Sequence, residues 1–209
     1  SEDKHMLELG ELVISLQTRS LLSAPLQIHS LELHDASILV TSNDSGDSNW
    51  QLLPDKPSDE TDARSDDVPL LVDEADFSNV RIRLSGPTLQ EASEILIDRY
   101  THGVNGERIA DTLSGEVNGF ALSFNSDLGP RQNIWRGEPV DIQLTGSLGE
   151  VTLTASALVD DLLDPQRPSA NLQLYGPDAA YLLNVLKLPP VANGPLTISS
   201  DVSIGEDRV

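Results

Sequence analysis

The sequence predicts a mainly β protein: an elongated, curved antiparallel sheet that forms an open β-groove or half-barrel, with one short helix packed at an end or edge. Three observations support this prediction. Segments with apolar residues at alternate positions recur along the chain, as in strands with one apolar face. Two of these segments are copies of one pattern. Asn-Gly and Gly-rich sequences separate neighbouring segments, which indicates hairpins and an antiparallel meander with one solvated face.

The internal repeat is the most informative of these features. Residues 25–40 and 69–84 carry apolar residues at matching slots, 44 positions apart (26 to 70). Most slots are spaced by two, but steps of three, as from Leu33 to Ala36, predict a bulge or tight bend. Reiterated units that cannot bury an apolar face alone build a long sheet by stacking. The matching slots are 26/70, 28/72, 31/75, 33/77, 36/80, 38/82 and 40/84.

The other strands follow in order along the chain. The first strand repeats the pattern, with Gly10 in the step between Leu9 and Leu12. Asn105-Gly106 and Asn118-Gly119 predict tight hairpin turns, and residues 146–149 predict another. The expected strands are 7–17, 26–34, 36–42, 70–77, 79–85, 93–99, 109–117, 120–126, 139–146, 150–158, 169–175 and 195–204.

One helix is expected at residues 178–187. Pro177 stands near its start, Pro189 and Pro190 end it, and several apolar residues share one face. A short turn at 19–23 links the first two strands. Residues 54–67 hold six acids and no aliphatic residue larger than Ala, which predicts a loop between the repeat copies. A cation site in that loop stays open, although the alternation of an EF-hand loop is missing.

Composition excludes several classes of function. The formal net charge is −21, which argues against nucleic-acid binding and against adsorption to anionic lipid surfaces. The absence of cysteine excludes disulfides, thiolate metal sites and cysteine nucleophiles. No phosphate-binding loop, dinucleotide fingerprint, nucleophile elbow or zinc-protease motif is present, so no cofactor and no metal are expected.

Carboxylates are plentiful, but the sequence shows no dedicated catalytic constellation. We expect His29 and His34 on the polar side of a strand and His102 in a turn. A Ser-His-Asp group or a carboxylate pair assembled by folding remains open. Aromatic residues make up only 4% of the chain, whereas glycan clefts usually present aromatic platforms. The apolar face is aliphatic, which suits either lipid acyl chains or an ordinary sandwich core. We therefore predict that the chain is not an enzyme.

Two stretches resemble the AsmA family of Gram-negative envelope proteins, within the wider group of repeating β-groove, bridge-like lipid-transfer proteins. Residues 20–33, continuing through Ile38-Leu39-Val40 to Gly46 and Asn49-Trp50, resemble the family's N-terminal stretch. Residues 176–183, with Leu188-Pro189-Pro190 and Gly194-Pro195-Leu196, resemble its later helix-plus-strand element. The segments 115–119 and 146–149 fit the family's hairpins.

The resemblance implies a periplasmic protein anchored in the inner membrane, with a long sheet whose concave face is apolar. It implies a role in outer-membrane lipid homeostasis by carrying phospholipid acyl chains. Because the strand pattern begins at once at Leu7, residues 1–6 are expected to be an expression remnant and the chain a piece of a longer protein. The resemblance implies that 7–209 is one elongated domain whose N-terminal anchoring helix is missing. Two alternatives stay open: a non-catalytic scaffold that binds an envelope protein partner, and a hydrolase of envelope glycans.

The predicted lipid-contacting residues are the apolar slots of the repeat and of the later hairpin. They are Ile28, Leu31, Leu33, Ile38, Val40, Val72, Phe77, Val80, Ile82, Leu84, Ile142, Leu144, Val151 and Leu153.

Overall fold

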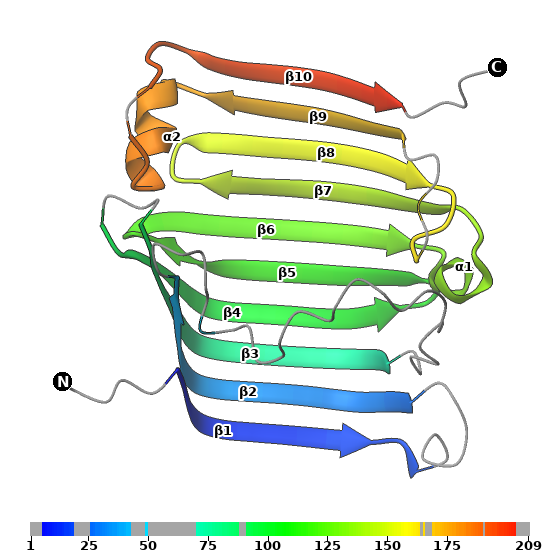
Figure 1. Ribbon diagram of the computed structural model, residues 1–209. Helices are drawn as coiled ribbons and strands as arrows, with labels where there is room; N and C mark the ends of the chain where they lie inside the picture. The colour runs from blue at the N-terminus through cyan, green and yellow to red at the C-terminus, as the bar shows by residue number, and fades with distance from the viewer. Residues whose placement is uncertain are drawn as a thin grey trace, which may run out of the picture.

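The protein forms one open sheet of ten strands, which lie in the sheet in the order of the chain (Figure 1). The computed structural model describes residues 6–18, 26–42, 49, 70–87, 91–163, 165, 169–189 and 191–203. The edge strands are β1 (Leu7–Leu16) and β10 (Leu196–Ser203), at opposite sides of the sheet. The predicted fold class is confirmed. The strands between are β2 (Leu26–Thr41), β3 (Leu70–Ser85), β4 (Ser93–Asn105), β5 (Arg108–Val117), β6 (Phe120–Gly129), β7 (Val140–Leu148), β8 (Val151–Val159) and β9 (Ser169–Gly176).

The two copies of the repeat lie side by side as β2 and β3, and this pair is parallel, whereas every other neighbouring pair is antiparallel. The register joins matching slots, such as Leu33 with Phe77 and Ile38 with Ile82. The expectation of an antiparallel meander fails at this one pair. A parallel pair needs a long connection, and residues 42–69 separate the two strands in the sequence. The predicted loop 54–67, the turn at 19–23 and residues 1–5 lie outside the described residues.

The predicted bulges are confirmed. The segments 26–34 and 36–42 form one strand, β2, and 70–77 and 79–85 form another, β3. Asp35 and Asn79 adopt left-handed backbone conformations at the two junctions, with φ of 56° and 52°. The Nδ2 atom of Asn79 donates a hydrogen bond of 2.5 Å to Oδ1 of Asp35. Each bulge keeps Leu33 and Ala36, or Phe77 and Val80, on the same face.

These bulges belong to a line of irregularities that crosses five strands, which we call the crease. In β4 the register against β5 shifts between Ile97 and Arg99. The neighbouring strands carry glycine at the crease because the bulged backbone comes close. A Cβ on Gly10 would lie 2.8 Å from the Cβ of Asp35. Figure 1 shows β1 to β4 bending sharply near their left-hand ends. The crease consists of Gly10, Asp35, Asn79, Asp98 and Gly115.

The hairpin turns follow the sequence signals closely. Asn118 and Gly119 both have positive φ, 53° and 81°, as the two central residues of a type I′ turn require. Gly106 also has positive φ, 63°, in the turn after Asn105. The turn between β7 and β8 lies later than predicted. Strand β7 continues through Gly146 to Leu148, and Gly149 (φ 55°) makes the turn.

Two short helices lie at opposite ends of the strands (Figure 1). Helix α2 (Ala179–Val185) is the predicted one, and the side chain of Asp178 caps it by accepting a 2.9 Å hydrogen bond from the backbone N–H of Ala180. It is shorter than 178–187 because Lys187 adopts a left-handed conformation, φ 56°. Helix α1 (Arg131–Arg136) was not predicted, because a single turn leaves too little apolar periodicity to detect.

Asn118 joins the β5–β6 turn to helix α2. Its Nδ2 atom donates to the backbone carbonyl of Val185 at 2.7 Å, and its Oδ1 atom accepts from the backbone N–H of Glu94 at 2.8 Å. Replacing Asn118 by aspartate keeps the acceptor and the tolerance for positive φ, but sets a carboxylate against the carbonyl. We expect a loss of about 1–3 kcal/mol in the free energy of unfolding, measured by urea denaturation. Asn105→Asp, in the exposed turn at the other end of the strands, is the control and should change stability by less than about 0.5 kcal/mol.

Candidate functional site

One face of the sheet is apolar across all ten strands. Side chains of directly paired residues share a face, so the register defines rows that run across the sheet. One such row contains no charged residue and one small break at Gly146. We call the surface that carries it the apolar face. The row consists of Leu12, Leu33, Phe77, Tyr100, Leu113, Phe124, Gly146, Leu153, Leu174 and Ile198.

The opposite face is polar, and the contrast shows in the adjacent row, where only Val13 is apolar. Ion pairs also lie on this face, including those of Arg99 with Asp76 and of Arg108 with Asp127 and Asp141. The sheet is therefore amphipathic as a whole. The polar row consists of Val13, Glu32, Asp76, Thr101, Thr112, Asn125, Thr145, Thr154, Gln173 and Ser199.

Among the described residues no second sheet packs on the apolar face. Large apolar residues of the two edge strands are close to half exposed, for example Leu12 at 48% and Ile198 at 46%. Soluble monomers seldom expose apolar patches larger than a few hundred square ångströms, and larger ones usually mark sites for lipid or protein partners. The apolar face is the strongest candidate for a functional surface.

The helices cover the strand ends. At one end the Tyr181 ring of α2 meets Phe120 edge-on, with the ring centroids 5.7 Å apart, and Val185 is fully buried. At the other end α1 contacts β6 and β7, where Ile134 and Val140 are buried. Part of the buried core thus lies beside each helix, and four apolar residues of β2 and β3 are buried as well: Ile28, Ala36, Ala75 and Val80.

All fourteen residues predicted to contact lipid lie on the apolar face. Three of them, Ile28, Val80 and Val151, are buried, and the others are partly exposed. Strands β4 to β6 connect the two predicted groups into one surface. The apolar residues of these three strands were not among the predicted ones, although the alternation in 109–117 and 120–126 indicates most of them. The missed residues include Ile95, Ile97, Leu113, Phe124 and Leu128.

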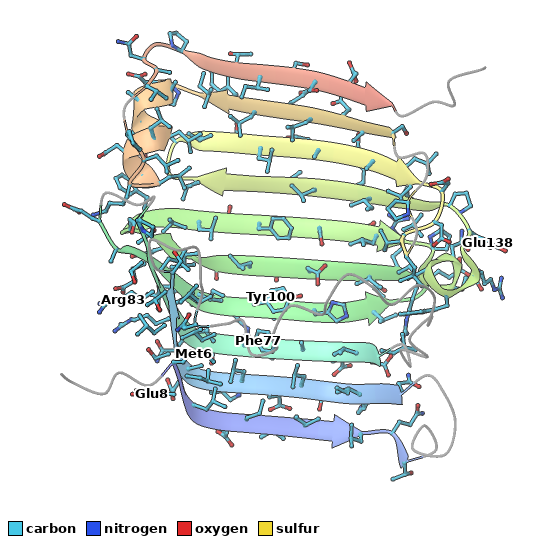
Figure 2. All side chains as sticks on the ribbon, viewed as in Figure 1. Met6, Glu8, Phe77, Arg83, Tyr100 and Glu138 are labelled. Carbon is cyan, nitrogen blue, oxygen red and sulfur yellow. The ribbon has the colours of Figure 1, made fainter. Side chains whose placement is uncertain are left out.

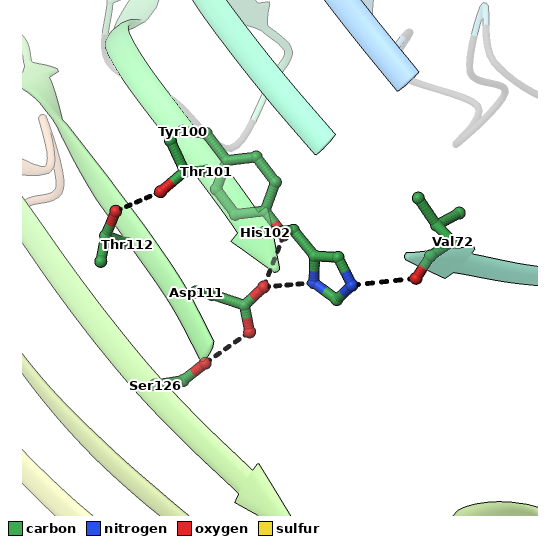
Figure 3. Close-up of polar contacts among 7 residues, drawn as sticks. All are labelled: Val72, Tyr100, Thr101, His102, Asp111, Thr112 and Ser126. Carbon is green, nitrogen blue, oxygen red and sulfur yellow. Dashed lines mark hydrogen bonds and ion pairs between the residues drawn. The ribbon is translucent and has the colours of Figure 1, made fainter. Parts of the chain in front are cut away.

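The apolar face contains one polar cluster in its middle, which we call the polar island: Tyr100, His102, Asp111 and Ser126 (Figure 3). Asp111 is its centre. One carboxylate oxygen, Oδ1, lies 2.7 Å from Nδ1 of His102 and accepts from the Tyr100 hydroxyl at 2.9 Å. The other, Oδ2, accepts from the Ser126 hydroxyl at 2.6 Å.

The island is enclosed by apolar neighbours. His102, Asp111 and Ser126 are consecutive partners across β4, β5 and β6, and Ala75 and Leu144 flank them in the same row. The rings of Tyr100 and Phe77 lie beside each other with their centroids 5.3 Å apart, and both residues are labelled in Figure 2. The side chains of His102 and Asp111 are only 18% and 15% exposed. The prediction that His102 lies in a turn is wrong, because β4 continues to Asn105 before the chain reverses.

The electrostatics of the island follow from its geometry. The hydrogen bond to Asp111 raises the pKa of His102 above its ordinary value, although burial opposes this. Burial alone would raise the pKa of Asp111, but hydrogen bonds from His102, Ser126 and Tyr100 outweigh it, and the pKa is lowered. Burial and the bond to Asp111 raise the pKa of Tyr100 to about 12. Both hydrogen-bonded partners thus favour their charged forms, the imidazolium of His102 and the carboxylate of Asp111.

The island brings serine, histidine and aspartate together, but not in the order that activates a nucleophile. In an acyl-transfer triad the histidine contacts the serine hydroxyl and the carboxylate orients the histidine. Here the Ser126 hydroxyl donates directly to Asp111, on the carboxylate oxygen opposite the one that His102 contacts. His34 lies on the polar face, as predicted, with Nδ1 2.7 Å from the Ser78 hydroxyl. No group of three or more potential metal ligands occurs within the described part of the chain.

No protein-family model matches the chain, and comparisons with curated proteins and with solved structures found no match either. None of the helices in the described ranges has the length and apolar character that crossing a membrane requires.

Proposed function

We propose that this chain holds the acyl chains of phospholipids on its apolar face. In this proposal it is a non-enzymatic segment of a periplasmic, inner-membrane-anchored protein of the AsmA type that supports outer-membrane lipid homeostasis. The observation that carries the proposal is an apolar surface that continues over ten strands without a second sheet on it among the described residues. The resemblance in sequence supports the location and the lipid class.

The size of the face suits this cargo. A diacyl lipid hides on the order of 30 methylene groups, and exposing them to water at roughly 0.8 kcal/mol each would cost about 24 kcal/mol. Nine strand spacings of about 4.8 Å give the face a length of about 43 Å, against about 15 Å for the hydrocarbon of one bilayer leaflet. A whole acyl chain therefore fits along the face, with its head group in water.

Site-specific photo-crosslinking tests the proposal on one strand. We expect a photoreactive residue at Ile142, on the apolar face, to capture phospholipid in cells, and one at Gln143, on the polar face, to capture little. The matched positions on β3 are Ile82 and Arg83. Equal capture at the two positions of each strand would contradict the proposal. Neighbouring residues of a strand point to opposite faces, so a lipid on the apolar face contacts only one of the two.

The alternative is a non-catalytic scaffold that binds an envelope protein partner. Its support is the open edge of β1, where Leu9 and Ile14 are exposed beside backbone groups that no described strand pairs. Mass spectrometry of lipid extracted from gently purified protein separates the two functions. We expect phospholipid at about one molecule or more per chain, whereas a scaffold would carry none.

A further inference from the structure

The sheet is split between β3 and β4 at one end. The ladder that joins these strands runs from Leu84–Ser93 and ends at Glu74–Gly103. On either side the pairing goes further: β3 pairs with β2 as far as Leu70, and β4 pairs with β5 as far as Asn105. We call this unpaired gap between residues 70–73 of β3 and 104–105 of β4 the seam.

Two side-chain contacts bridge the seam. Nε2 of His102 lies 3.2 Å from the backbone carbonyl oxygen of Val72, the first of these contacts (Figure 3). Arg131 of α1 donates to Oδ1 of Asp73 at 2.5 Å, the second, and its backbone N–H donates to the carbonyl of Glu107 in the turn that follows β4. A hollow of about 490 Å³ adjoins the seam and is lined by residues of β2, β3 and β4, among them His102 and Gly103. The seam is thus the place where the sheet is held by side chains instead of by backbone pairing.

The histidine bridge depends on a proton. Nδ1 of His102 faces the Asp111 carboxylate and Nε2 faces the carbonyl of Val72, and both partners are acceptors. Both ring nitrogens must therefore carry hydrogen, which only the imidazolium form provides. A neutral ring keeps one N–H, and the ionised Asp111 is the stronger acceptor. The bond to Val72 is then the one that is lost, which leaves a lone pair against a carbonyl.

We propose that His102 is a proton-dependent bridge across the seam, closed when the imidazole is charged and open when it is neutral. This inference does not depend on the lipid proposal. The charged and titratable groups around the ring favour different states. Asp111 of β5 favours the charged ring, and Arg131 of α1 opposes it but is itself paired with Asp73 of β3. Glu74, Asp76, Glu32 and His34 line the adjoining hollow on the polar face, on the other side of the sheet from the ring.

The direction of the effect follows from linkage. Hydrogen bonds to Asp111, the larger contribution, and to the carbonyl of Val72 both raise the pKa of His102 in the closed form. The bond to Asp111 persists in the open form, so the bond to Val72 is what makes the pKa of the closed form higher than that of the open form. The bridge is complete below the pKa of the open form and is lost as the pH rises through the pKa of the closed form. Each unit by which this pKa exceeds that of the open form changes the opening equilibrium by about tenfold.

Amide hydrogen exchange followed by NMR, together with titration of the His102 ring, tests the bridge. After correction for the intrinsic exchange rate, we expect protection of the amides beside the seam, at 74–75 and 103–104, to fall as the pH is raised from about 5.5 to about 8.5. Amides of the β8–β9 ladder should keep theirs. His102→Gln should remove the pH dependence at the seam, and His34→Gln, on the polar face, should leave it intact.

Three results would overturn the proposal: a ring pKa of His102 at or below 6.5, seam protection that does not change with pH, or the same loss of pH dependence in His34→Gln. If His102→Gln does not fold, Asp111→Asn provides the test. It keeps the shape of the side chain but removes the charge that favours the imidazolium. The seam should then open at lower pH than in the wild type, and an unchanged opening pH would equally refute the bridge.

Discussion

Replacing Gly115 by alanine is expected to lower the free energy of unfolding by about 3 kcal/mol or more, a large effect for one methyl group. The new Cβ would lie 2.0 Å from the carbonyl oxygen of Leu96 and 3.1 Å from the Cα of Ile97. Both atoms belong to the backbone of β4, so they cannot rotate away as a side chain would. Strand β4 would have to move off β5, and overpacking of this kind typically costs 1–3 kcal/mol or more. Urea denaturation at constant pH measures the loss.

Gly103→Ala is the matched control on the neighbouring strand. A Cβ at Gly103 would meet no atom within 4 Å. Replacing a strand glycine by alanine without strain also reduces the freedom of the unfolded chain, so stability should be unchanged or raised by up to about 1 kcal/mol. If Gly115→Ala proved as stable as Gly103→Ala, β4 would not approach β5 at the crease as closely as described.

The crease could be predicted from the sequence in three strands but not in all five. In β2 and β3 the apolar residues step by three across Asp35 and Asn79, and Gly10 stands in the same step in β1. The step of three also occurs in β4, from Ile97 to Tyr100. The apolar pattern does not reveal it, because the residues that follow on the same face are the amphipathic Tyr100 and the polar His102. Gly115 interrupts no pattern at all. Its role depends on the bulge in the next strand, which only the register reveals.

The parallel pairing of β2 and β3 could not be derived from hairpin rules. These rules apply to strands joined by short turns, and residues 42–69 separate this pair in the sequence. The constant spacing of the repeat did contain the information. Two copies with the same polarity and the same bulge positions match slot for slot only when they run in the same direction, because reversing one copy would place Asp35 opposite a regular part of the other strand.

The apolar face was predictable, whereas the polar island was not. Alternation along each strand fixes which residues share a face, so the fourteen predicted residues fell on one surface. The island needs three residues from three strands to come into register, and no local pattern encodes that. Along its own strand, each of the three residues only interrupts the alternation of apolar and polar residues: His102, Asp111 and Ser126. Together they satisfy each other's hydrogen bonds, as a polar group in an apolar setting must.

Replacing Leu153 by glutamate is expected to remove bound phospholipid while leaving the fold intact. Leu153 is the β8 member of the apolar row, between Gly146 and Leu174, and it is partly exposed. In the protein without lipid, a carboxylate at this position can remain hydrated. An acyl chain lying across it would strip that water, at a cost of at least about 2 kcal/mol, which corresponds to roughly a thirtyfold loss of affinity.

Thr154→Glu is the matched control for this prediction. Thr154 is the next residue on β8, is exposed and points to the polar face. A glutamate at this position adds the same charge but does not lie on the apolar face. Both variants should unfold at similar urea concentrations, and only Leu153→Glu should lose the lipid extracted with the protein. If both kept their lipid, the acyl chains would not cross β8. If both lost it equally, added negative charge alone would explain the loss, and the apolar face would no longer be distinguished as the binding surface.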